Sequence, residues 1–362
     1  MNHQVLYRKY RPKSFDEVIG QEHVVGVLTS ALAQGKVAHG YLFAGPRGVG
    51  KTTVARLIAK AMNCEGKTRP CNDCNFCNEF NEGRSMNLIE IDAASNRGID
   101  EVRELRENVR ITPGSGNYKI YVIDEAHQLT KDAFNALLKT LEEPPQHAVF
   151  ILATTELDKL PQTIVSRLQH FDFRRPSFAE IAARLIGIAG KEGISLEKDA
   201  AETVARLGEG SMRDAESILG RVVAVERGNI TLKTLEEFLG LPRRELVRAV
   251  VAAVSEKNPR AVVASLHDVV GQGHDLGYFT KALLENFRAA LALKADPTLR
   301  EFLVDSFPKE DLDFLEAKTA SLSHDELNRA VRLLLVSVGE HKRSPIPELP
   351  LELALLEVIL EN

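Results

Sequence analysis

The chain has 362 residues, of which 44% are hydrophobic and 27% are charged, and its formal net charge is −5. This balance is typical of a soluble globular protein with two or three domains, and a pI of about 6.1 excludes a general basic surface for nucleic acid, so any DNA contact must be local. No apolar run reaches the length of a membrane span and residues 1–4 do not open a signal peptide, so we expect a cytoplasmic protein without membrane contact.

A short basic run lies near the start of the chain, where residues 8, 9, 11 and 13 are Arg or Lys and alternate with Tyr7 and Tyr10. Basic residues interleaved with aromatic ones can hold the phosphates and bases of a nucleic acid. A second interpretation, in which this segment belongs to a nucleotide pocket, depends on the family resemblance described below.

The motif G-x-x-x-x-G-K-T occupies residues 45–52, between an apolar run at 40–44 and a helical pattern at 49–62. A strand before this motif and a helix after it are the setting of a phosphate-binding loop (P-loop), in which backbone N–H groups and the helix N-terminus surround a polyphosphate. Lys51 would reach the β- and γ-phosphates, and the hydroxyl of Thr52 would ligate Mg²⁺. The motif therefore predicts that a nucleoside triphosphate binds here, at Gly45, Gly48, Val49, Gly50, Lys51, Thr52 and Thr53.

The chain has four cysteines, Cys64, Cys71, Cys74 and Cys77, and they follow one another within a polar segment after this helix. Four thiolates so close in sequence suit a tetrahedral Zn²⁺, and a closed set of four leaves no open position for catalysis. Disulfides are not expected in a reducing compartment, and the spacing lacks the Cys-Pro ending of the bacterial ferredoxin run that would favour an iron–sulfur cluster. We predict a structural zinc site that holds this insertion.

Two further segments carry candidate residues. Arg97 and Gly98 precede a helical pattern at 99–110, and a helix N-terminus can bind a DNA phosphate, although an ordinary helix start explains them equally well. The apolar run at 119–123 reads as a buried parallel strand that ends in Asp124 and Glu125. Beside a P-loop, Asp124 suits a Mg²⁺ contact and Glu125 suits the base that orients the attacking water, whereas the alternative is that the pair caps the next helix.

Strand-like and helical patterns alternate over the first 175 residues, which predicts a parallel sheet flanked by helices. From residue 178 onwards the pattern is helical. We therefore expect an α/β nucleotide-binding domain at 1–177 with the zinc module at 64–77, a small helical domain at 178–242, and an all-helical domain at 243–362. The expected strands are residues 41–44, 87–91, 119–123, 148–154 and 169–173, and the expected helices of the first domain include residues 22–34, 49–62, 99–110 and 131–142.

Several motifs occur in one order along the chain: Y-R-K-Y-R-P at 7–12, F-D-E-V-I-G-Q at 15–21, the P-loop, the four cysteines, D-E-A-H at 124–127, L-K-T-L-E-E-P-P at 138–145 and S-R at 166–167. Together they resemble the gamma/tau ATPase subunits of the bacterial DNA polymerase III clamp loader, which are AAA+ proteins. The resemblance covers the whole chain. It implies an α/β P-loop AAA+ domain, a helical lid domain and a C-terminal collar domain for oligomerisation.

The resemblance also implies roles for single residues. Thr155 matches the sensor-1 position, at the tip of the expected strand 148–154, and Tyr7, Arg11 and Pro12 match positions around the adenine and ribose. Arg213 matches the sensor-2 position.

Local chemistry supports the Arg213 assignment, because a cation in the first turn after a good N-cap, Ser211, is misplaced unless an anion faces it. Arg167 matches the arginine finger, which acts in trans at the neighbouring subunit's ATP site. It is followed by Leu168, where the family commonly has Cys.

The function implied by the resemblance is that of a DNA-stimulated ATPase within the DNA polymerase III holoenzyme, without a polymerase active site of its own. ATP with Mg²⁺ would close an assembly of clamp-loader subunits that opens a sliding clamp, and primer-template DNA, held through its backbone, would trigger hydrolysis. The alternatives are another AAA+ motor, such as a branch-migration helicase or a protein remodeller, and a clamp-loader relative that does not hydrolyse ATP. The family often carries a long tail after this region, so we expect a short form or a shortened chain.

Overall fold

The computed structural model describes residues 5–226, 228–304 and 307–360, and the chain forms two compact units, Met1–Thr231 and Leu232–Asn362. The second unit begins with helix α11 (Leu232–Leu239), before the boundary predicted at residues 242–243. The chain after this helix is bonded within that unit, because the carbonyl of Gly240 accepts a hydrogen bond of 2.9 Å from the N–H of Asp275. The division into three domains stays a prediction.

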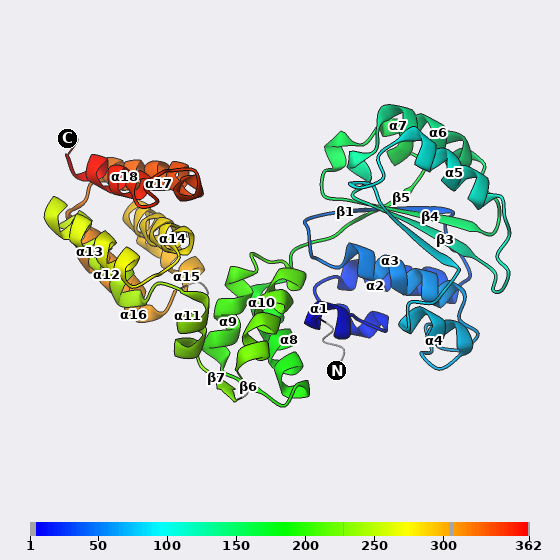
Figure 1. Ribbon diagram of the computed structural model, residues 1–362, viewed down its shortest axis with the longest axis horizontal. Helices are drawn as coiled ribbons and strands as arrows, with labels where there is room; N and C mark the ends of the chain where they lie inside the picture. Colours follow the sequence, from blue (N-terminus) through cyan, green and yellow to red (C-terminus); the bar gives the residue numbers. More distant parts are fainter. Residues whose placement is uncertain (1–4, 227, 305–306, 361–362) are drawn as a thin grey trace. The chain divides into compact units, whose positions relative to one another are not determined.

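The first unit contains a parallel sheet of five strands in the order β2-β3-β4-β1-β5 (Figure 1). Strands β1 and β4 are buried along their whole length, since helices cover both faces of the sheet. Because all five strands are parallel, the residues that follow their carboxyl ends meet at one edge. The strands are β1 (Gly40–Ala44), β2 (Leu88–Asp92), β3 (Lys119–Asp124), β4 (Ala148–Thr154) and β5 (Gln169–Asp172).

Two pairs of helices cover the two faces of this sheet (Figure 1). Helices α2 (Glu22–Ala33) and α3 (Lys51–Met62) pack on the face that presents Phe43 and Ile151. Helices α5 (Ile99–Val109) and α6 (Lys131–Glu142) pack on the face that presents Leu42 and Tyr121. Alternate strand residues therefore enter two separate cores, as the period of a strand requires.

The predicted strands and helices of this domain are confirmed, with ends that differ by at most two residues. The largest difference is at α3, which begins at Lys51 rather than at residue 49, because Val49 and Gly50 belong to the P-loop and Gly50 has a left-handed backbone (φ 107°). Helix α6 ends before Pro144 and Pro145, as expected, and the side chain of Thr130 caps its start by accepting a hydrogen bond from Ala133 N–H.

The remainder of the first unit forms the lid and several short elements. The sequence predicted a helical lid, but the lid also contains two strands of two residues each, which pair in parallel. Strands of this length are too short to give a periodic pattern in the sequence. The lid elements are α8 (Phe178–Lys191), β6 (Ser195–Leu196), α9 (Lys198–Leu207), α10 (Met212–Val225) and β7 (Asn229–Ile230). The other short elements are α1 (Leu6–Lys9), η1 (Phe15–Glu17), α4 (Asn75–Asn81), η2 (Ala126–Gln128), η3 (Leu157–Lys159) and α7 (Gln162–Val165).

The second unit is helical throughout its described residues, and its core contains Phe279 and Phe287, which are fully buried. The side chains of Asn258 and Asp275 cap the helices that follow them. No helix within the described ranges has both the length and the apolar character of a transmembrane segment. After α11, the elements are α12 (Arg244–Ser255), α13 (Pro259–Gly271), α14 (Leu276–Ala295), η4 (Pro297–Leu299), α15 (Arg300–Leu303), α16 (Lys309–Lys318), η5 (Thr319–Ser321), α17 (His324–Ser337), η6 (Glu340–Lys342) and α18 (Leu349–Leu360).

Candidate functional site

The P-loop follows β1 and wraps the N-terminal end of α3. Gly45 and Gly48 have left-handed backbones, with φ of 146° and 76°, and neighbouring atoms also leave no room for a Cβ at either position. A Cβ at Gly45 would meet the backbone of Phe173, and one at Gly48 would meet the side chain of Ser211. The loop therefore packs directly against the segment that leaves β5 and against the start of α10 in the lid.

Lys51 is 6% exposed and folds back over the P-loop. Its ammonium group donates hydrogen bonds to the carbonyl oxygens of Gly45 (2.7 Å) and Pro46 (2.8 Å). Burial lowers the pKa of Lys51, and the carboxylates of Glu125 and Asp124 oppose that shift. A buried cation held only by two carbonyl oxygens is ready to exchange them for an anionic phosphate.

The expected magnesium ligands lie together. The hydroxyl of Thr52, on the first turn of α3, donates a hydrogen bond of 2.9 Å to Oδ2 of Asp124, at the end of β3. Two hard oxygen donors from adjoining elements fit Mg²⁺, which is commonly held by one or two protein groups together with substrate phosphates and water.

Glu125 lies next to Asp124 with a left-handed backbone (φ 48°, ψ 44°), which is uncommon for a residue other than glycine. Its Oε2 accepts a hydrogen bond of 3.0 Å from the hydroxyl of Thr155, just after β4. Asp124 and Glu125 do not cap the following α-helix, since α6 is capped by Thr130.

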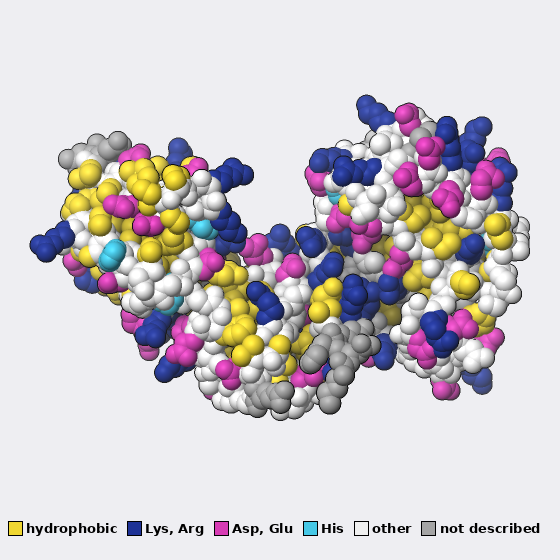
Figure 2. All heavy atoms as spheres, viewed as in Figure 1, with side chains coloured by type: hydrophobic (Ala, Val, Ile, Leu, Met, Phe, Trp, Pro, Cys, Tyr) yellow, Lys and Arg dark blue, Asp and Glu magenta, His cyan; other side chains and the backbone are white. Residues whose placement is uncertain are grey.

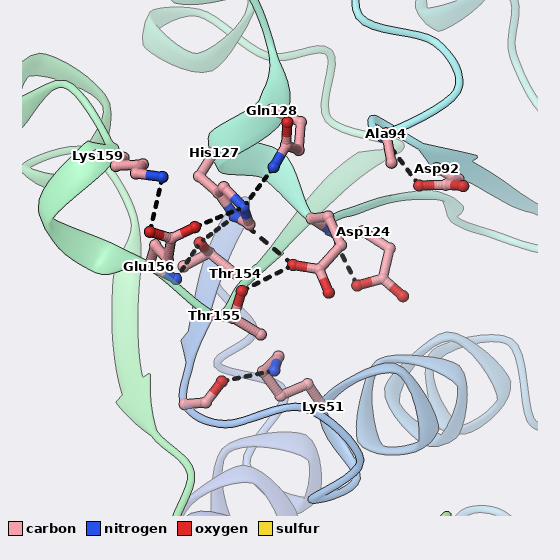
Figure 3. A network of polar contacts seen from close by, with 12 residues as sticks. Lys51, Asp92, Ala94, Asp124, His127, Gln128, Thr154, Thr155, Glu156 and Lys159 are labelled. Atoms are coloured by element: carbon pink, nitrogen blue, oxygen red, sulfur yellow. Dashed lines mark hydrogen bonds and ion pairs between the residues drawn. The ribbon is translucent and has the colours of Figure 1, made fainter. Parts of the chain in front are cut away.

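His127 supports this arrangement and was not predicted from the sequence. Its side chain is 4% exposed, and Nδ1 lies 3.0 Å from the hydroxyl of Thr154 and 3.6 Å from Oε2 of Glu125 (Figure 3). Its Nε2 lies 3.2 Å from Glu156 and 2.9 Å from the amide of Gln128. The imidazole therefore joins the ends of β3 and β4 behind the candidate base.

A cavity extends from the P-loop towards the N-terminal segment and the lid. Its walls include Tyr7, Arg11 and Pro12, so the structure brings the predicted base pocket and the P-loop into one cavity. Gly48, Val49, Gly50, Lys51, Thr52, Thr53, Asp124 and Glu125 line the same cavity. An adjoining hollow is lined by Gly45, Glu125 and Thr155 and also by Arg175, another residue that the sequence analysis missed.

Arg213 reaches this cavity from α10, whose first turn is capped by Ser211 as predicted. The guanidinium carbon lies 4.9 Å from the centre of the Tyr7 ring, in a cation–π arrangement. Hydrogen bonding to Arg213 lowers the pKa of Tyr7. Arg213 thus joins the lid to the N-terminal segment at the cavity wall.

A buried ion pair at the cavity wall was also missed. Glu216 of α10 is 5% exposed, and its Oε1 lies 3.4 Å from Nε of Arg184 of α8. Arg184 donates a second hydrogen bond to the carbonyl of Tyr10. Burial raises the pKa of Glu216 to about 7, although Arg184 opposes the shift.

Gln21 links the P-loop to the start of the lid from a fully buried position. Its amide exchanges two hydrogen bonds with the backbone of Arg174, at 2.6 and 3.1 Å, and also reaches the carbonyl of Val49 at 3.4 Å. The contact joins residues 153 positions apart, so no local pattern in the sequence indicates it.

Arg167 and Arg97 do not line this cavity. Arg167, after α7, donates hydrogen bonds of 2.6 Å to Glu142 and to the carbonyl of Thr163. Arg97 donates a hydrogen bond of 3.0 Å to the carbonyl of Ala94, and Gly98 is the N-cap residue of α5. An arginine finger that acts in trans has to lie away from its own nucleotide site, so the position of Arg167 is compatible with that prediction.

The four cysteines converge although they belong to a loop and a short helix. The four sulfur atoms lie within 4.8 Å of one another. Backbone N–H groups of Gly66 and Cys71 point at the sulfur of Cys64, at 3.3 and 3.2 Å, and the N–H of Cys74 points at Cys71, at 3.4 Å. Four close sulfurs that accept N–H hydrogen bonds are a donor set that fits Zn²⁺.

A parallel sheet with a P-loop after β1, an acidic pair after β3 and a helical lid at the same cavity defines a P-loop nucleotide-binding protein of the AAA+ class. Family models match three consecutive segments: "DNA polymerase III, delta subunit" at residues 20–177, "DNA polymerase III clamp loader subunit, ATPase lid domain" at 180–228, and "DNA polymerase III subunits gamma and tau domain III" at 230–361.

Individual proteins are similar over nearly the whole chain. DNA polymerase III subunit tau of Bacillus subtilis is 38% identical over 99% of this chain and 63% of its own length. DNA polymerase III subunit gamma of Buchnera aphidicola (subspecies Schizaphis graminum) is 36% identical over 100% of this chain and 99% of its own length. The solved RuvB branch migration motor of Thermotoga maritima aligns with a TM-score of 0.49 and 23% identity, over 71% of this chain and 85% of that chain. The chain belongs to the DNA polymerase III gamma/tau subunit family, and it spans less than two thirds of the Bacillus relative.

Proposed function

We propose that this chain is an ATPase subunit of a bacterial DNA polymerase III clamp loader, which opens a sliding clamp and loads it on primed DNA. Membership of the gamma/tau family supports the proposal. The observation that carries it is the meeting of Lys51, Thr52, Asp124 and Glu125 at one cavity. This set includes the phosphate-binding lysine, two candidate Mg²⁺ ligands and a candidate base, which argues against a relative that only binds ATP.

In this proposal the triphosphate of ATP occupies the P-loop. Lys51 leaves the two carbonyl oxygens and pairs with the β- and γ-phosphates. Thr52 and Asp124 would hold Mg²⁺, which would neutralise charge on the phosphate oxygens. Glu125 orients and polarises the attacking water, and Thr155 holds either that water or the γ-phosphate from the other side.

The base and the lid complete the site. Tyr7, Arg11 and Pro12 would surround the adenine and ribose, because they line the same cavity as the P-loop residues. Arg213 would turn from the Tyr7 ring to the phosphates, so that nucleotide binding draws the lid towards the P-loop.

In the assembled clamp loader, a neighbouring subunit would supply the arginine finger of the site. Arg167 would exchange its intrachain partner Glu142 for the γ-phosphate on a neighbouring subunit, and an arginine finger of this kind raises hydrolysis rates about 10³-fold or more. The C-terminal unit would form the collar. Figure 2 shows hydrophobic side chains on the surface of this unit. The exposed ones include Leu335 (63%), Val336 (64%) and Leu353 (57%), and burying them between subunits would favour association.

DNA and zinc have accessory roles in the proposal. Arg97 and the backbone N–H groups at the start of α5 would contact the backbone of primer-template DNA. The chain would thus act in the cytoplasm as part of the replication machinery. Cys64, Cys71, Cys74 and Cys77 would hold a structural Zn²⁺, which would tie the insertion to the end of α3.

The test is steady-state ATP hydrolysis by the chain reconstituted with partner subunits and sliding clamp, with and without primed DNA, for the wild type and Arg167→Ala. We expect strong stimulation by clamp and primed DNA, and loss of hydrolysis in Arg167→Ala with ATP binding retained. Hydrolysis that is indifferent to the clamp would instead favour another AAA+ motor. Arg84→Ala is a matched control, because this exposed arginine lies between α4 and β2, outside both the cavity and α5.

A further inference from the structure

Lys60 is a buried cation in the last turn of α3, the helix that begins at the P-loop. It is 3% exposed. Its ammonium group donates hydrogen bonds to the carbonyl of Lys13 (3.1 Å), to the side-chain oxygen of Asn81 (2.7 Å) and to that of Asn72. All three acceptors are neutral, and no carboxylate among the described residues forms an ion pair with Lys60.

The two asparagines place Lys60 against the cysteine module. Asn72 directly follows Cys71, and Asn81 is the last residue of α4, the helix that contains Cys77. Burial lowers the pKa of Lys60, Lys13 lowers it further, and the thiolates of Cys77, Cys64 and Cys71 oppose both. Because both asparagines belong to the segment that carries the cysteines, the ammonium group of Lys60 lies against the cysteine module.

Charge balance gives a physical reason for the contact between Lys60 and the cysteine module. A buried ammonium without an anionic partner is costly, because neutral acceptors replace its hydration only in part. Four thiolates around one Zn²⁺ carry a formal charge of −2, which is equally costly to bury unless a cation or N–H donors surround it. The N–H groups that point at Cys64 and Cys71 supply part of this compensation.

We infer that Lys60 is the counter-cation of the four-cysteine zinc site, so that the end of the P-loop helix and the occupied metal site stabilise each other. The inference rests on the proposed zinc site and not on ATP hydrolysis. Without zinc the charged site that the ammonium group compensates is absent, and among the described residues the buried ammonium is left with neutral acceptors. The contribution of Lys60 to stability therefore depends on whether zinc is bound.

The experiment compares the wild-type chain with Lys60→Met, which keeps an unbranched side chain only one atom shorter and removes its charge. Lys67→Met is the matched control, since Lys67 is exposed and lies in the same module between Cys64 and Cys71. Zinc content is measured by elemental analysis, and zinc affinity by competition with a chelator under reducing conditions. Denaturant unfolding is measured with zinc bound and after its removal.

We expect one zinc per wild-type chain, a 10- to 100-fold weaker affinity in Lys60→Met, and a change of about twofold or less in Lys67→Met. Lys60→Met should be less stable than the wild type with zinc bound, and equally or more stable without it. Equal zinc affinities, or the same loss of stability in both states, would overturn the inference and leave Lys60 a packing residue. Wild type without zinc would overturn the zinc site itself, whereas the ATPase proposal would stand. If Lys60→Met does not fold, Lys60→Gln is read against the same criteria.

Discussion

Glu216→Gln removes an ionisable group from the wall of the nucleotide cavity and changes little else in shape. Glu216 is 5% exposed, and its pKa is about 7 in the folded chain against an ordinary value of 4.5, because burial outweighs the attraction of Arg184. The folded state therefore holds a proton on Glu216 at pH values where the unfolded state has released it. Folding stability from this group is greatest below pH 4.5 and is lost as the pH rises towards 7.

The size of the effect follows from the two pKa values. The two pKa values differ by about 2.5, and each pKa unit corresponds to about 1.36 kcal/mol. The free energy of unfolding of the wild type should therefore fall by about 3 kcal/mol between pH 4 and pH 8 through this group. Glutamine resembles the protonated carboxyl group and does not titrate. Glu216→Gln should thus unfold at a similar free energy to the wild type near pH 4.5, and should be more stable by about 3 kcal/mol at pH 8.

The assay is denaturant unfolding of both chains, without nucleotide, at intervals between pH 4.5 and 8. The quantity of interest is the difference between variant and wild type, because the titration of every other group cancels in it. Glu104→Gln, at an exposed position of α5, is the control and should show a difference near zero at every pH. A Glu216→Gln difference that is constant with pH, or that favours the wild type at pH 8, would refute the reasoning.

The remaining predictions concern the nucleotide. Glu125→Gln should lower kcat about 10²- to 10⁴-fold while a fluorescent ATP analogue still binds, and an equal loss of binding would contradict a role as base. Lys51→Met should abolish detectable binding of the analogue, because a buried charge-assisted contact is removed. Arg213→Ala should weaken ATP binding about 10- to 100-fold, since a hydrogen bond to a charged group contributes ~1.5–3 kcal/mol, whereas ADP affinity should change less.

The features that the sequence predicted correctly are encoded by neighbours in the chain. The P-loop glycines, Lys51 and Thr52 belong to one loop, and Asp124 and Glu125 end one apolar run, so spacing alone is enough to predict that they lie together, as they do at the cavity. The strand and helix ends were predicted within two residues because fully apolar runs, caps such as Thr130 and breakers such as Pro144 act locally.

The features that were missed depend on packing between distant segments. Arg184 bonds to the carbonyl of Tyr10 across 174 positions, and Glu216 has a perturbed pKa only because α8 and α10 bury it. His127 was visible within the D-E-A-H motif, but its contact with Thr154 requires the pairing of β3 with β4. The two-residue strands of the lid carry no periodic signal at all.

The position of β4 between β1 and β3 has a consequence for the molecule that could accept the terminal phosphoryl group of a bound nucleotide. Neighbouring strands lie about 4.8 Å apart, so the strand that leads into the phosphate loop and the strand that ends beside Glu125 are about 10 Å apart. In the proposed hydrolysis, a terminal phosphate group would fill part of this width. Two adjacent strands would press the carboxylate of Glu125 against that phosphate. The intervening strand β4 would therefore act as a spacer that leaves room for a water molecule.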